Sequence, residues 1–152
     1  MQYGYFDNEK REYVIDNVAL PCSWTNYLGV EDMAAVINHT AGGYLFYKTP
    51  EYHRISRFRG NGVAMDRPGF YVYIRDNEKK DYHSISWQPV AKDLSKAKYR
   101  CRHGLSYTVY ESEYDGLASS QTMVIPCGEN VLLWDVKVKN TTDAVRNLSL
   151  FT

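Results

Sequence analysis

Two runs rich in aromatic and β-branched residues, joined by an aspartate and a glycine, decide the fold of this chain. The first reads Tyr107-Thr108-Val109-Tyr110-Glu111-Ser112-Glu113; after Tyr114-Asp115-Gly116 the second runs from Leu117 to Ile125. An Asp-Gly pair between two β-prone runs predicts a tight hairpin, because a type I′ turn needs residues that tolerate positive φ. We therefore expect two antiparallel strands here.

Short runs of the same kind lie on both sides of this hairpin and are bounded by Gly, Pro, Asn and Asp. They cover residues 11–15, 43–47, 70–75, 82–85, 131–139 and 146–151. Strands at roughly 8–12-residue spacing with turns between them predict an all-β antiparallel sandwich with little helix. Only two stretches allow a helical interpretation: 30–37, as a short helix or equally as a strand, and 93–98, as a single turn.

Length and charge exclude several classes of protein. The 152 residues make one ordinary domain, and 18 Lys and Arg balance 18 Asp and Glu. A neutral chain lacks the excess of cations by which proteins bind nucleic acid or an anionic membrane surface. No segment approaches the roughly 18 apolar residues of a membrane span, and the first residues do not resemble a signal peptide. We expect a soluble, cytoplasmic protein without nucleic-acid or membrane partners.

The sequence contains no recognisable metal or nucleophile motif. Three cysteines without CxxC spacing predict neither a disulfide framework nor a zinc site, and the four histidines occur singly. Gly60-Asn61-Gly62 is too short for a phosphate-binding loop. Asp7 and Asp66 have no partner in the sequence pattern, so paired acid–base chemistry is not predicted. We therefore expect no metal and no catalytic residue in this chain.

Two small groups of residues are candidates for ligand binding. The cluster Arg54, Arg57 and Arg59 could hold a phosphate or carboxylate, or could form a solvated or intersubunit ion-pair face. Trp87 together with Arg102 and His103 could contact a sugar, with the indole stacked on the ring; a buried tryptophan with a satisfied N–H is the alternative.

Collinear aromatic and glycine anchors across the chain resemble the start of the inverting glycoside phosphorylases of glycoside hydrolase family 94. The family includes cellobiose and N,N′-diacetylchitobiose phosphorylases. The anchors are Tyr3-Gly4-Tyr5-Phe6-Asp7, Arg11-Glu12-Tyr13-Val14-Ile15, Trp24-Thr25-Asn26-Tyr27-Leu28-Gly29, Ala41-Gly42-Gly43-Tyr44, Phe46-Tyr47, Asp66-Arg67-Pro68-Gly69, Trp87-Gln88-Pro89-Val90, Arg102-His103-Gly104-Leu105-Ser106-Tyr107 and Leu148-Ser149-Leu150-Phe151. The run Ser84–Lys92, Pro50-Glu51-Tyr52 and Ser106 are more similar to the chitobiose type.

This resemblance implies a reaction that the chain itself would not catalyse. Family members convert a β-linked disaccharide and inorganic phosphate into an α-sugar 1-phosphate and a free sugar, with inversion and no other cofactor. Their acid and phosphate-binding residues lie in an (α/α)6 barrel downstream of an N-terminal β-sandwich. The resemblance also implies a homodimer, and leaves the donor sugar, glucose or N-acetylglucosamine, open.

The run Leu148–Thr152 ends inside an apolar, alternating pattern. We accordingly expect residues 1–152 to be a β-sandwich domain, truncated at its C-terminal end, of a longer enzyme whose barrel is absent. Two alternatives stay open. One is a stand-alone carbohydrate-binding sandwich that uses Trp24, Trp87 or Trp134 as a stacking platform. The other is a structural role, in which Arg54, Arg57, Arg59 and the apolar 148–151 edge pack on a barrel or partner subunit.

Overall fold

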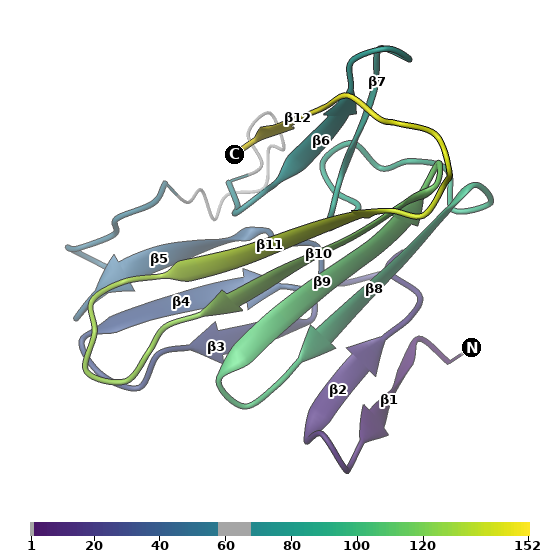
Figure 1. Ribbon diagram of the computed structural model, residues 1–152. Coiled ribbons are helices and arrows are strands. Elements are labelled where there is room, and N and C mark those ends of the chain that lie inside the picture. Colours follow the sequence, from purple (N-terminus) through teal and green to yellow (C-terminus); the bar gives the residue numbers. More distant parts are fainter. Residues whose placement is uncertain (1, 58–67) are drawn as a thin grey trace.

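The computed structural model describes residues 2–57 and 68–152, and within these ranges it contains strands and no helix (Figure 1). The strands are β1 (Gly4–Asp7), β2 (Glu12–Ile15), β3 (Thr25–Leu28), β4 (Met33–Asn38), β5 (Gly43–Tyr47), β6 (Tyr73–Asp76), β7 (Asp81–Ser84), β8 (Ala97–His103), β9 (Tyr107–Tyr114), β10 (Leu117–Val124), β11 (Leu133–Asn140) and β12 (Leu148–Phe151). The prediction of an all-β domain is confirmed.

The strands form three antiparallel sheets. The largest has the order β1-β2-β8-β9-β10-β11, and the two smaller ones have the orders β3-β4-β5 and β12-β6-β7. The predicted hairpin is β9 and β10, in which Tyr114 pairs with Leu117. Asp115 and Gly116 both have positive φ, 48° and 75°, as a type I′ turn requires. The antiparallel sandwich expected from the sequence is therefore confirmed.

The helical interpretation of residues 30–37 is wrong, because the second half of that segment is strand β4. Its side chains alternate between buried and half-buried, with Met33, Ala35 and Ile37 facing the core. Alternation with a period of two is what a half-buried strand requires. The other segment is a turn, since the carbonyl of Asp93 accepts from the amides of Lys96 and Ala97 where β8 begins.

One face of the six-stranded sheet shares a single apolar core with both smaller sheets. Buried side chains from all three sheets belong to one contact cluster, including Ile15, Cys101, Tyr110, Leu117, Met123, Leu28, Ala35, Ile37 and Ile74. A two- or three-stranded sheet gains its stability chiefly from such packing. The β3–β5 and β6–β7–β12 sheets are therefore held in place by the face of β8–β11 that they cover.

Hydrogen bonds and ion pairs reinforce the contacts between sheets. The buried Tyr110 hydroxyl of β9 donates to the carbonyl of Asn38 at 2.7 Å, at the end of β4. The guanidinium of Arg146 binds the Asp76 carboxylate of β6 at 2.6 Å and the Asp115 carboxylate of the β9–β10 turn at 2.8 Å. These bonds connect each small sheet to the large one.

Removing the Tyr110 hydroxyl tests the link between β9 and β4. Tyr110→Phe is expected to lower the free energy of unfolding by about 1 kcal/mol, because one buried hydrogen bond is lost while the ring stays packed. Urea denaturation followed by circular dichroism measures this. Tyr82→Phe, at an exposed position, is the matched control and should leave the unfolding midpoint unchanged. An equal effect in the two variants would contradict the inter-sheet role of Tyr110.

Candidate functional site

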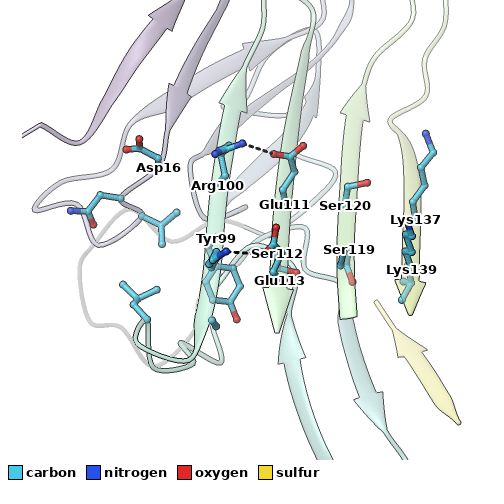
Figure 2. Close-up of a pocket in the computed structure, with 17 residues that line it drawn as sticks. Asp16, Tyr99, Arg100, Glu111, Ser112, Glu113, Ser119, Ser120, Lys137 and Lys139 are labelled. Carbon is cyan, nitrogen blue, oxygen red and sulfur yellow. Dashed lines mark ion pairs between the residues drawn. The ribbon is translucent and has the colours of Figure 1, made fainter. Parts of the chain in front are cut away.

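The face of the six-stranded sheet that points away from the core carries a hollow of about 830 Å³. Two rows of residues in register cross it from β8 to β11: Lys98, Glu113, Ala118 and Lys139 form the first, and Arg100, Glu111, Ser120 and Lys137 the second. Figure 2 shows the side chains of these strands around the hollow. Small side chains of β10, Ala118, Ser119 and Ser120, line it together with long charged side chains of β8, β9 and β11.

The charges of this hollow are largely paired with one another. Lys98 lies 3.2 Å from Glu113, Arg100 lies 4.0 Å from Glu111, and on β11 Lys137 lies 2.9 Å from Asp135. All of these groups are partly or mostly exposed, so each pair contributes little to stability. An open hollow with paired charges can make ionic and hydrogen-bonding contacts with a ligand or partner, but it offers no shielded environment for chemistry.

Arg102, a candidate sugar contact, lies on this same charged face and is already engaged. Its guanidinium donates to Glu12 at 2.7 Å and to Glu111 at 3.0 Å, and the Tyr107 hydroxyl also donates to Glu12, at 2.6 Å. Burial alone would raise the pKa of the Glu12 carboxyl, but the bonds from Tyr107 and Arg102 lower that pKa below its ordinary value. The hydrogen bonds among Glu12, Arg102, Tyr107 and Glu111 therefore connect β2 to β8 and β9.

The other two candidates lie elsewhere. His103 follows Arg102 on β8, so its side chain points to the opposite face, where Nδ1 lies 3.0 Å from the Thr108 hydroxyl. Trp87 packs against the far end of β8, on Ala97 and Tyr99. Its Nε1 donates to the Lys92 carbonyl at 2.9 Å. The structure does not bring Trp87 together with Arg102 and His103, and their role in sugar binding stays a prediction.

The other sequence candidates are dispersed. Arg59, Asp66 and the segment 60–62 lie outside the described residues, and Arg54 and Arg57 both have interaction partners. Trp24 packs beside Tyr13, and Trp134 meets Phe70 edge-on. Within residues 2–57 and 68–152, no three His, Cys, Asp or Glu side chains group as metal ligands. No helix in those same ranges is long and apolar enough to cross a membrane.

A second hollow, of about 550 Å³, lies beside the β3–β5 sheet. Its walls include the rings of Tyr44, Tyr71 and Trp87 and the polar side chains of Asn38 and Gln88. Trp87 has a positive φ of 72°, a conformation that side chains rarely adopt, and the Ser84 hydroxyl holds its carbonyl at 2.6 Å. Trp87 was a candidate from the sequence, whereas Tyr44 on β5 and Tyr71 just before β6 were not. Tyr44 alternates with Phe46, and Tyr71 with Tyr73, and that pattern could have identified them.

The fold defines the chain as an all-β sandwich domain, and comparison with known proteins specifies the family. The model of the glycosyl hydrolase 94 supersandwich domain matches residues 11–152, and the chain belongs to this family. The chain is 54% identical over its whole length to the N,N′-diacetylchitobiose phosphorylase of Vibrio proteolyticus and 52% identical over 99% of its length to that of Vibrio furnissii. The solabiose phosphorylase of Paenibacillus borealis is 28% identical over 99% of the chain. The chain spans about a fifth of the length of these relatives, 19% of each.

Two buried histidines, His39 and His83, and the half-buried His103 predict acid sensitivity of the fold. Burial, and for His83 the nearby Lys92 charge, lowers the pKa of His83 and of His103 to about 4, and burial also lowers the pKa of His39. In the unfolded chain, each of these histidine side chains binds its proton near pH 6.5. We therefore expect the histidines to leave the free energy of unfolding undiminished above pH 6.5. Between pH 6.5 and 4 it should fall by up to about 1.4 kcal/mol per pH unit for each histidine, because only the unfolded chain takes up the proton.

Urea titrations at pH 7, 6, 5 and 4 test this expectation. His83→Gln removes one titrating group and should flatten the decline, whereas His53→Gln, at an exposed position, should leave it as steep as in the unaltered chain. A free energy of unfolding that stays constant from pH 7 to pH 4 would show that the buried histidines are not held neutral by the fold.

Proposed function

We propose that this chain is the N-terminal, non-catalytic domain of a disaccharide phosphorylase that acts on N,N′-diacetylchitobiose. The parent enzyme would convert this disaccharide and inorganic phosphate into an α-sugar 1-phosphate and free N-acetylglucosamine, with inversion. The observation that carries the proposal is the identity of 54% and 52% with two enzymes of that name. Two phosphorylases named for other disaccharides are 28% and 32% identical to the chain, and the higher identities support N,N′-diacetylchitobiose as the substrate.

The non-catalytic role is supported by the state of the acidic groups on the charged face. Glu12, Glu111 and Glu113 each form an ion pair with a cation of β8. A general acid needs a raised pKa and access to the glycosidic oxygen, whereas the pKa of Glu12 is lowered. We place the acid and the phosphate site in the barrel that the family resemblance implies, and phosphate as the only co-substrate.

The remaining parts of the proposal concern location, assembly and contacts. We propose a cytoplasmic homodimer, as the resemblance implies. Within the domain, Trp87 is the proposed saccharide contact, because it lines the second hollow beside Tyr44 and Tyr71. Arg102 and His103 remain candidate contacts on the two faces of β8. A stand-alone carbohydrate-binding module is the second candidate function, favoured by the aromatic rings of Tyr44, Tyr71 and Trp87 in that hollow.

A phosphate-release assay separates the two functions. α-N-Acetylglucosamine 1-phosphate and α-glucose 1-phosphate are each supplied with N-acetylglucosamine or glucose as acceptor. The full-length chain from the same source should release phosphate with the N-acetylglucosamine pair in preference to the glucose pair, and residues 1–152 alone should release none. Activity of the short chain would contradict its non-catalytic role. Inactivity of the long chain with both donors would favour the binding module.

A further inference from the structure

The outward face of β9, β10 and β11 carries opposite charges on its two sides. Two glutamates project from β9 and two lysines from β11, and the strand between them presents small uncharged side chains (Figure 2). The residues are Glu111 and Glu113 of β9, Ala118 and Ser120 of β10, and Lys137 and Lys139 of β11. The face therefore has an acidic side, a neutral middle and a basic side.

Each glutamate of this face is level with a lysine. Ala118 pairs with Glu113 on one side and with Lys139 on the other. Ser120 pairs in the same way with Glu111 and Lys137. A two-fold rotation about an axis parallel to β10, above its outer face, exchanges the two sides of the face and keeps the rows level. A second copy related by this rotation places its β9 over β11 of the first copy, so the charge pattern is complementary to itself, as an isologous contact requires.

The charged side chains are long and exposed enough to reach a second copy. The side chains of Glu113 and Lys137 are 65% and 75% exposed. Lys139 is also exposed and, among residues 2–57 and 68–152, has no ion-pair partner. Facing sheets pack about 10 Å apart, a gap that one extended glutamate and one extended lysine can span. The hollow over the short side chains of β10 then becomes a hydrated space between the two copies, as in other polar interfaces.

The size of the face predicts a weak, reversible contact. Strands of eight residues, such as β9, β10 and β11, are about 27 Å long and about 4.8 Å apart. The face of β8–β11 therefore covers about 500 Å² per copy, and a dimer buries about 1,000 Å² in total, near the lower limit for a specific interface. Lys98, which lies 3.2 Å from Glu113, leaves that glutamate between a cation of its own copy and a lysine of the other.

We propose that two copies of this chain associate face to face through β9–β11, with Glu113 of each copy against Lys139 of the other and Glu111 against Lys137. The partner is identified by the order of charges across three strands, which a second copy matches row by row. This contact supplies a surface for the homodimer proposed above, but it is argued from strand register and charge alone and does not depend on the substrate.

Charge reversal on the two sides of the face tests the proposal in the 152-residue chain. Sedimentation velocity at about 0.5 mM chain is expected to show dimers in about 50 mM NaCl and monomers in about 500 mM NaCl, because salt screens exposed ion pairs. Glu113→Lys and Lys139→Glu should each weaken the dimer tenfold or more, roughly, since each sets like charges against one another at two symmetric places. An equimolar mixture of the two variants should restore dimers, because every reversed residue then meets an opposite charge.

Glu129→Lys makes the same change of charge at an exposed turn position outside the face and is the matched control, which should dimerise as the unaltered chain does. Thermal unfolding of each variant confirms that the fold is intact. A chain that stays monomeric at low salt would overturn the proposal. Dimers that survive both reversals, or a mixture that stays monomeric, would also overturn it. Phosphate release by a full-length chain with any of these results would leave the proposed function standing.

Discussion

The six-stranded sheet buries one face under two separate three-stranded sheets, and the whole domain depends on that shared core. Neither small sheet has a second layer of its own within the described residues, so each is stable only while Tyr110, Met123 and their neighbours cover its apolar side. The same constraint fixes which faces remain outside. The outer face of β8–β11 and the outer face of β3–β5 are two of the surfaces left to meet ligands or other protein.

Those two surfaces differ in chemistry, and the difference indicates their roles. The face of β8–β11 presents alternating cations and carboxylates that satisfy one another, as a solvated or polar protein-contacting surface does. The face of β3–β5 presents tyrosine, valine and phenylalanine, and Arg54 forms a β-bridge with Phe46 at its edge. An exposed patch of that composition is typical of an interaction site. Both surfaces are therefore suited to recognition and assembly, which agrees with the proposed non-catalytic role of the domain in a phosphorylase.

Local patterns predicted most strands but not their arrangement. The Asp115-Gly116 hairpin follows from turn chemistry, whereas the pairing of β2 with β8 joins residues nearly ninety positions apart, for which no local signal exists. The helical interpretation of 30–37 failed because tertiary burial on one side, not intrinsic propensity, determines β4. Strand alternation could have shown that Arg102 and His103 point to opposite faces. The position of Trp87 could not be predicted, because it depends on a loop held at positive φ.

Native-state hydrogen exchange tests the shared core most directly, because it reports the opening free energy of each strand separately. If one core holds the three sheets, the buried amides of Ile37 in β4, Ile74 in β6 and Tyr110 in β9 should exchange with the same free energy. That value should equal the global free energy of unfolding from urea titration, with the same denaturant dependence. Exchange of β4 or β6 at a clearly lower free energy, while β9 stays protected, would show that the small sheets open independently and would contradict this account.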